Sequence, residues 1–252
     1  MNIQKDKHID GKKISSEIKQ QLKLEIEKLN QKLHSKPTLS VIIVGQRSDS
    51  LLYVKNKEKS CKEIGIESNV HHFHTNISEN ELILEVNKMN NNQDINGILI
   101  QLPLPKHINE EKVLSKVSII KDVDGFGATN IGKLAMLNRI PYFTPCTPLG
   151  CMKLLEYENV DLVGKHAVII GRSNIVGLPT SLLLLNARAT VTICHIDTQN
   201  IQEITKKADI LVVACGCAHL VKKEWIKEDV IIIDVGINYI EDKTKKSGKR
   251  LV

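Results

Sequence analysis

Apolar, β-branched runs alternate with helical patterns through the second half of the chain, and this alternation constrains the fold more than any other feature. Four such runs occur, and they read KHAVIIG, ATVTICH, DILVVACG and DVIIIDVG. The stretches between them, SLLLLN, IQEITKKA and VKKEWIKE, have helical patterns. Near-continuous runs of this kind are typical of parallel strands covered by helices on both faces of a sheet. The sequence therefore predicts a Rossmann-like domain in this half.

The first half has the same alternation in a less regular form. We expect helices over residues 9–29, 48–64 and 79–90, with helix N-caps offered by Ser48, Asp49 and Ser50 and a C-terminal stop at Gly65. Strands are expected over 39–44, 68–74 and the buried run INGILI. Three prolines between residues 141 and 148 interrupt the pattern, and a helix from about Thr147 to Tyr157 follows them. We predict two α/β domains, 1–145 and 146–252.

Composition excludes several classes of protein. The chain of 252 residues is 42% hydrophobic and 25% charged, which is ordinary for a globular protein. No apolar run approaches the roughly 20 residues of a membrane span, and the amino terminus lacks the apolar core of an export signal. Six cysteines without C-x-x-C spacing indicate reduced thiols and a cytoplasmic location. His71, His72 and His74 have no second cluster to complete a metal site, so we expect no metal.

The net charge of +6 admits two kinds of anionic ligand. Nucleic acid is one, but aromatic residues make up only 3% of the chain and no nucleic-acid-binding motif accompanies the lysines. A small polyanion fits the charge equally well. The basic stretch 243–250 is interpreted mainly as a solvated tail.

Tyr53 and Lys57 are the first candidates for chemistry. They are four residues apart in a predicted helix, so they lie on the same face. An amine beside an aromatic ring, on a helix that follows a buried strand, is suited to acid/base catalysis. Gln101 follows another buried strand, and Asp124 lies in KDVDG; ligands of open α/β sheets bind at such strand ends and loops. Asp122 and Asp124 could instead be turn residues beside Gly125.

The turn from Gly171 to Gly177 connects a predicted strand with a predicted helix. Backbone N–H groups and the helix N-terminus at such a turn can bind a phosphate. The turn is not G-x-G-x-x-G, so a purely structural strand–helix turn is the alternative. Asp197 lies where an acidic residue would bind a ribose 2′-hydroxyl, whereas Arg172 would favour a 2′-phosphate. Asp197 could also be the N-cap of the next helix.

Together these residues form a pattern that resembles the bifunctional methylenetetrahydrofolate dehydrogenase/methenyltetrahydrofolate cyclohydrolase family. The motifs occur in the family's order and spacing, and they are VG-x-x-x-x-S-x-x-Y-V-x-x-K (Val44 to Lys57), QLPLP (Gln101 to Pro105), KDVDG (Lys121 to Gly125), PCTP-x-G (Pro145 to Gly150), GRS-x-IVG-x-P (Gly171 to Pro179), ATVT-x-CH (Ala189 to His195) and DVGIN (Asp234 to Asn238). Seven motifs in register are far more specific than any one of them.

The resemblance implies a folate-binding catalytic domain, a cofactor domain and a folate cleft between them. It implies oxidation of 5,10-methylenetetrahydrofolate with NADP and hydrolysis of the product to 10-formyltetrahydrofolate, within one-carbon metabolism and purine biosynthesis. By motif, Lys57 is the catalytic lysine, Gln101 its partner, Tyr53 a residue that packs on the folate, and Asp124 the anchor of the pterin. The nucleotide site would include Gly171, Arg172, Ser173, Ile196 and Ile237. A homodimer and polyglutamylated folates are further implications.

Two departures from the family pattern bear on function. Ile196 stands where relatives usually carry Ser or Arg for the 2′-phosphate, which leaves NAD open as the alternative cofactor. The chain ends at KRLV, whereas relatives continue with a loop beside the folate and a further helix, so we expect the C-terminal end of the cofactor domain to be missing here. The alternatives are a non-catalytic descendant that binds a nucleotide or a partner, and a different nicotinamide dehydrogenase.

Overall fold

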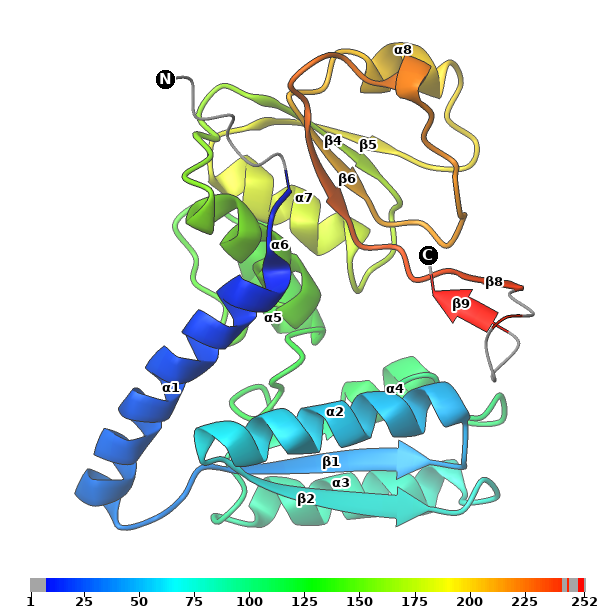
Figure 1. Ribbon diagram of the computed structural model, residues 1–252. Coiled ribbons are helices and arrows are strands. Elements are labelled where there is room, and N and C mark those ends of the chain that lie inside the picture. Colours follow the sequence, from blue (N-terminus) through cyan, green and yellow to red (C-terminus); the bar gives the residue numbers. More distant parts are fainter. Residues whose placement is uncertain (1–7, 242–243, 245–248, 252) are drawn as a thin grey trace. The chain divides into compact units, whose positions relative to one another are not determined.

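The computed structural model describes residues 8–241, 244 and 249–251 (Figure 1). The chain divides into two compact units. The first unit comprises Met1–Lys133 with Ile140–Thr144, and the second comprises Leu134–Arg139 with Pro145–Val252. Both are α/β units with parallel sheets, so the predicted fold class is confirmed. The basic stretch 243–250 lies largely outside the described residues.

The sheet of the first unit contains three parallel strands in the order β2-β1-β3. The central strand β1 (Thr38–Val44) is buried from Ser40 onward, as its apolar sequence predicts. It pairs with β2 (Glu67–Phe73) on one side and with β3 (Gly97–Ile100) on the other. The carboxyl ends of these strands therefore meet at one edge of the sheet, where the polar residues that follow them lie.

Helices cover both faces of this sheet. α2 (Ser48–Ile64) packs on the face that carries Val41 and Ile43, through Val54. α3 (Glu79–Asn91) and α4 (Glu110–Leu114) cover the opposite face, where Ile42 and Val44 lie. The long helix α1 (Gly11–Leu33) contacts α2, and a Lys19–Glu63 ion pair of 2.6 Å joins the two helices. α5 (Ala128–Leu134) follows α4 in the chain and precedes the segment that leads to the second unit.

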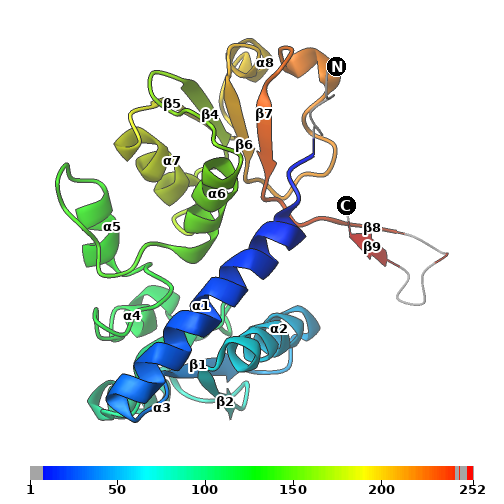
Figure 2. The ribbon, with the colours of Figure 1, turned by 60° about the vertical axis from the view of Figure 1, so that its left-hand side comes forward.

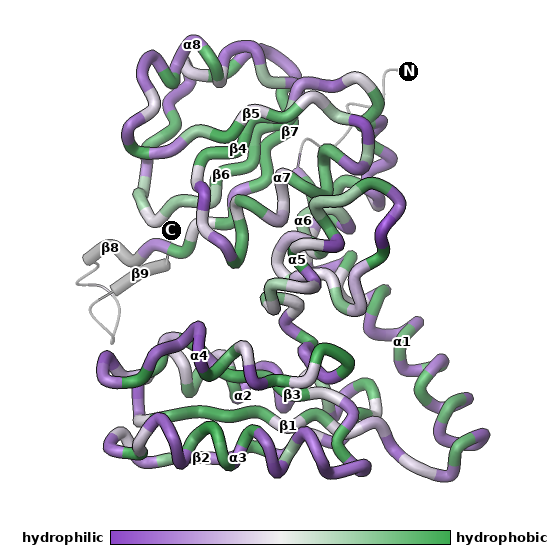
Figure 3. Tube along the Cα trace, turned by 180° about the vertical axis from the view of Figure 1, so that it is seen from behind, coloured by the Kyte–Doolittle hydropathy of each residue, from purple (hydrophilic) through white to green (hydrophobic). Residues whose placement is uncertain are grey.

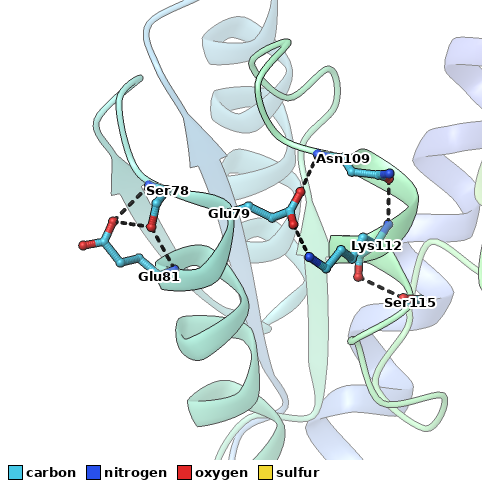
Figure 4. Close-up of polar contacts among 6 residues, drawn as sticks. All are labelled: Ser78, Glu79, Glu81, Asn109, Lys112 and Ser115. Carbon is cyan, nitrogen blue, oxygen red and sulfur yellow. Dashed lines mark hydrogen bonds and ion pairs between the residues drawn. The ribbon is translucent and has the colours of Figure 1, made fainter.

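Polar contacts fix the start of α3 and tie it to α4 (Figure 4). The Ser78 hydroxyl accepts from the N–H of Glu81, and the Glu81 carboxylate accepts from the N–H of Ser78, which is a capping box. The Glu79 carboxylate accepts from the N–H of Asn109 at 2.9 Å and forms an ion pair with Lys112 on α4. These contacts hold the two helices side by side on the sheet.

The second unit contains four parallel strands in the order β5-β4-β6-β7. The strands are β4 (His166–Ile170), β5 (Thr190–Cys194), β6 (Ile210–Val213) and β7 (Ile231–Asp234). The chain passes from β4 to β5 on one side and then crosses to β6 on the other. This reversal is the switch point at which α/β sheets bind ligands. The apolar runs of the sheet are visible in Figure 3.

Helices cover this second sheet as well (Figure 2). α6 (Cys146–Tyr157) contacts α7 (Gly177–Asn186), which packs on β4 and β5. α8 (Ile201–Thr205) packs on the face that carries Val168 and Leu211, as do the residues on either side of the short 3₁₀ helix η1 (Lys223–Trp225), which contacts α8. An antiparallel pair, β8 (Tyr239–Glu241) and β9 (Lys249–Leu251), follows.

Two local predictions were wrong. The stretch VKKEWIKE is not a helix but a single 3₁₀ turn with extended residues around it. The predicted N-caps Ser48, Asp49 and Ser50 lie inside the first turn of α2, so Arg47 occupies the N-cap position without a side-chain cap, and Asp49 forms a 2.7 Å ion pair with it. The stop at Gly65 is confirmed by its left-handed backbone, with φ of 89°.

Within the described ranges, none of the helices is long and apolar enough to cross a bilayer.

Candidate active site

Lys57 lies on α2 beside the helix face that packs on the sheet. The buried residues of that face, Ser50, Val54 and Cys61, recur at helical spacing, and Lys57 falls three residues after Val54. Its side chain is half-buried, and its Nζ donates a hydrogen bond of 3.1 Å to Oε1 of Gln101. The bond runs from α2 to the end of β3 and holds the amine in one position.

Gln101 is fixed through both its backbone and its side chain. Its N–H donates to the carbonyl of Ile42 at 2.8 Å, which continues the pairing of β3 with β1. Its side-chain Nε2 donates to the carbonyl of Leu102 at 2.9 Å. Because the amide nitrogen is engaged there, the amide oxygen faces the lysine. The predicted proximity of Lys57 and Gln101 is thus confirmed.

Asp124 is the third member of this cluster, which we call the Lys57 cluster (Lys57, Gln101 and Asp124). Its carboxyl group is largely withdrawn from water, and this burial raises its pKa to about 6. The nearby Lys57 ammonium lowers this pKa, while the Asp122 carboxylate raises it further. An amine, an amide and a carboxyl group of altered acidity therefore come together in the first unit. This combination is typical of acid/base sites.

The loop that carries Asp124 runs beside β3. The backbone of Asp122 pairs with that of Ile98, whose N–H donates to the carbonyl of Lys121 at 2.7 Å. A side chain at Gly97 would meet Val123 at 2.6 Å, so glycine is needed for this close approach. The pairing places the loop next to the strand that ends at Gln101.

Asp122 and Asn130 hold the same loop in shape. The Asp122 carboxylate accepts from the N–H groups of Gly125 and Gly127 and from the side-chain amide of Asn130. Asn130 is fully buried, and its oxygen accepts from the N–H groups of Tyr142 and Phe143. Asp122 is therefore a turn residue, as one of the two interpretations held. Asn130 was not predicted, because nothing local in the sequence signals its contacts.

Tyr53 lies one helical turn before Lys57 on α2. Its side chain remains 43% exposed, so the ring can still pack against a ligand. The two residues share the helix face that their spacing predicts.

The turn between β4 and α7 is closely packed. A side chain at Gly171, where φ is 122°, would lie 2.2 Å from the carbonyl oxygen of Ala214. One at Gly177 would lie 2.1 Å from the carbonyl oxygen of Gly171. Dinucleotide-binding turns need glycines for such a tight turn and for close helix–strand packing. The Ser173 hydroxyl accepts from the N–H groups of Val176 and Gly177, at 3.2 and 3.4 Å, which shapes the turn. The residues present fit a dinucleotide.

The side chains around this turn do not all favour the same nucleotide, because some suit NADP and others suit NAD. Arg172 is exposed and lies directly after the first glycine. Ile196 is 97% exposed after β5, and Ile237 is 53% exposed after β7. Asp197 is exposed, and its carboxylate lies 3.5 Å from Nδ1 of His195. The interpretation of Asp197 as a helix N-cap is wrong, because α8 begins after Asn200.

The fold and these groups define an α/β enzyme with one Rossmann-like nucleotide unit and one unit that carries a lysine-centred acid/base cluster. Residues 9–124 match the catalytic domain of tetrahydrofolate dehydrogenase/cyclohydrolase, and residues 145–250 match its NAD(P)-binding domain. The chain belongs to the tetrahydrofolate dehydrogenase/cyclohydrolase family.

Individual relatives agree with this assignment. The chain is 52% identical to bifunctional protein FolD 2 of Arabidopsis thaliana, over 98% of this chain and 82% of the relative. The crystal structure of the FolD enzyme from Campylobacter jejuni has a TM-score of 0.90 and 46% identity, over 97% of this chain and 84% of that one. The Trypanosoma brucei enzyme, solved with NADP and an inhibitor, has a TM-score of 0.92 and 37% identity, over 96% and 83%.

Proposed function

We propose that this chain uses the Lys57 cluster to carry out the cyclohydrolase reaction of its family, with Lys57 as the acid and base. The chain is a bifunctional enzyme that oxidises 5,10-methylenetetrahydrofolate to the methenyl form and hydrolyses that product to 10-formyltetrahydrofolate. The observation that carries the residue assignment is the 3.1 Å hydrogen bond from Lys57 to Gln101, with Asp124 close enough for its pKa to respond to the lysine charge.

Hydration of a methenyl cation needs a group that removes a proton from water and later returns one to the departing nitrogen. An amine can do both, provided that it is held at the reacting carbon. Gln101 accepts one N–H of Lys57 and so orients the amine without neutralising it. Tyr53, exposed on the same helix face, would support the flat ring system of the folate. Asp124, when ionised, would accept hydrogen bonds from the N–H groups of a pterin.

The dehydrogenase step makes different demands on the protein. When bound, NADP supplies the hydride acceptor. The folate nitrogen assists departure of the hydride, so the protein contributes mainly orientation of the substrate. We therefore assign no proton transfer to Lys57 in this step.

Substitution of Lys57 by Met tests the assignment. Met has a similar volume but neither donor nor base, and general acid/base groups typically contribute about 10²–10⁴-fold in rate. We expect cyclohydrolase kcat to fall by that order while dehydrogenase activity falls much less, so that methenyltetrahydrofolate accumulates. Lys55→Met, at an exposed position on the same helix, is the matched control. Near-normal hydration by Lys57→Met would show that the amine is structural.

We propose NADP rather than NAD as the preferred cofactor, by a narrow margin. Arg172 is exposed and available for a 2′-phosphate, whereas Ile196 offers no polar contact and Asp197 would repel an anion. A charge-assisted hydrogen bond contributes about 1.5–3 kcal/mol, or roughly 10- to 150-fold in affinity. The trypanosome relative was solved with NADP, while a yeast structure that is 19% identical is described as NAD-dependent.

Steady-state kinetics with both cofactors measure this preference. We expect kcat/KM to be higher for NADP, and Asp197→Ser to widen the difference because it removes the repelling carboxylate. Asp161→Ser, at another exposed position of the same unit, should leave the ratio unchanged. A preference for NAD of tenfold or more in the unaltered chain would contradict the proposal.

We propose that residues 1–145 bind the folate and residues 146–252 bind the nucleotide. The family matches and the division of the chain into two units support this assignment. We further propose a cytoplasmic homodimer that binds no nucleic acid, accepts polyglutamylated folates and supplies one-carbon units for purine biosynthesis. The net charge of +6 favours such polyanionic substrates. Light scattering would give the oligomeric state, and KM values for folates with one and five glutamates would test the preference.

A further inference from the structure

Cys215 and Cys217 lie two residues apart, directly beyond β6. Both line a cavity of about 340 Å³ in the second unit. Cys217 is exposed and Cys215 is half-buried. The lining contains apolar side chains, the basic residues His219, Lys222 and Lys223, and the acidic residue Asp234. The proposed catalytic and nucleotide-binding roles use neither thiol.

The backbone between the two cysteines is bent and adaptable. It bends at Cys215 and Gly216. Gly216 does not have a left-handed φ, and a side chain there would meet nothing within 4 Å, so packing does not require glycine at this position. What a glycine provides is conformational freedom. A bend shortens the distance between the two Cα atoms, and a disulfide needs them within about 4.4–6.8 Å.

The two thiols differ in a way that suits stepwise exchange. Burial raises the pKa of the Cys215 thiol, although the N–H of Cys217 is directed to its sulfur and lowers that pKa in part. Cys217 is the more accessible thiol, so it would react first with a disulfide in solution. Lys222 and Lys223 outnumber the single carboxylate in the lining, Asp234, and would attract a small disulfide that carries carboxylates.

The segment also lies against the candidate nucleotide turn. The carbonyl of Ala214 fits against Gly171 so closely that a side chain there would be 2.2 Å from its oxygen. The carbonyl of Cys215 fits against Gly236 in the same way, at 2.5 Å, and Gly236 precedes Ile237. A change of backbone conformation at Cys215 would therefore shift both glycine contacts.

We propose that Cys215 and Cys217 form a reversible intramolecular disulfide on exposure to low-molecular-weight disulfides, and that this disulfide weakens nucleotide binding. The Cys217 thiolate attacks the small disulfide, forming a mixed disulfide and releasing one small thiol. The Cys215 sulfur, after losing its proton to solvent, then attacks the Cys217 sulfur and releases the second small thiol. Two protein thiols are oxidised and one small disulfide is reduced. The effect on binding rests on the proposed nucleotide site, but formation of the disulfide does not.

Mass spectrometry after incubation with glutathione disulfide tests the first part. Both cysteines lie in one tryptic peptide, residues 208–222, because no Lys or Arg separates them from Lys207 and Lys222. We expect this peptide to lose the mass of two hydrogen atoms and to recover it with dithiothreitol. Cys217→Ser should prevent the loss, and Cys146→Ser, at the other exposed cysteine, should not. A stable glutathione adduct, or two unmodified thiols, would overturn the proposal.

The KM for NADP before and after oxidation tests the second part. Couplings between two sites typically change affinity by about 5- to 150-fold, and we expect a reversible increase in that range. The Cys217→Ser protein should show no increase under the same treatment. If the disulfide forms and the KM is unchanged, the proposed control of binding is wrong. If reduced protein does not turn over NADP, the proposed cofactor is wrong while the disulfide remains measurable.

Discussion

At the scale of single residues, the buried carboxyl group of Asp124, the proposed anchor of the pterin, lowers the stability of the folded chain when it is ionised. Burial raises its pKa from 3.8 to about 6, so the folded protein binds a proton more tightly than the unfolded chain does. Between roughly pH 4 and 6 the folded state therefore carries more protons, and its stability falls as pH rises through this window. Above pH 6 the ionised carboxylate opposes folding.

Asp124→Asn should consequently raise the melting temperature at pH 7.5, with a gain that shrinks toward pH 4. Folate binding should weaken, because the neutral amide cannot replace the carboxylate. In the unaltered chain, binding should decline as pH falls through about 6, where Asp124 takes up a proton. Thermal melts and folate titrations between pH 4 and 8 measure both effects. Asp94→Asn, at an exposed position, is the control, and a gain in stability that does not depend on pH would contradict this account.

The individual site residues could be predicted to different extents. Lys57 lies on a predicted helix that follows a buried strand, and Gln101 directly follows another buried strand. Because parallel strands end at the same edge of a sheet, the local sequence predicts that both residues lie near that edge. Asn130 and Lys121 could not be predicted, because their contacts are with residues far away in the chain. Asn130 binds the backbone at Tyr142 and Phe143, and Lys121 binds backbone carbonyls some thirty residues earlier. Such contacts depend on the assembled fold rather than on any local pattern.

At the scale of elements, Lys121 terminates α3. It is a buried lysine, and its Nζ donates to the carbonyls of Met89, Asn90 and Asn92 at 3.2, 2.9 and 2.6 Å. A cation at a helix C-terminus satisfies the final carbonyls and interacts favourably with the helix dipole. The same residue begins the loop that carries Asp124, so the end of α3 and that loop are fixed together.

Lys121→Met should therefore lower the free energy of unfolding by about 2–4 kcal/mol, because buried carbonyls lose a charged donor. Denaturant unfolding measures the change. Lys116→Met, at an exposed position nearby, should stay within about 0.5 kcal/mol, as surface substitutions usually do. Equal effects of the two substitutions would show that the three hydrogen bonds contribute little.

Most of the elements that the alternation of apolar and helical patterns predicts are present. The absence of one expected helix, VKKEWIKE, from the described part of the chain has a physical reason. The stretch expected to form a helix after β6, residues 221–228, contains Val221 and Ile226, which pack on the sheet together with Leu220 and Val230 on either side of it. On a helix these positions would point in different directions and could not all reach one surface. An irregular, mostly extended path buries them all, so packing against the sheet outweighs local helix propensity.

At the scale of the whole molecule, ligand binding should increase the free energy of unfolding and therefore the melting temperature. A ligand that binds only the folded chain stabilises it by about 2.7 kcal/mol at a concentration 100 times its Kd. For a protein of this size, that corresponds to a rise in Tm of roughly 5–10 °C. The net charge of +6 further favours binding of the more anionic cofactor at low salt.

NADP should therefore raise the Tm of the reduced protein more than the same concentration of NAD does. A tenfold difference in affinity corresponds to about 1.4 kcal/mol, or roughly 3–6 °C. Arg172→Ala should remove this difference, because it deletes the cation that directly follows the first glycine of the turn. Lys165→Ala, at the opposite end of β4, should preserve it and so control for the loss of one positive charge. Equal shifts for the two cofactors in the unaltered chain would show that Arg172 does not contact the 2′-phosphate.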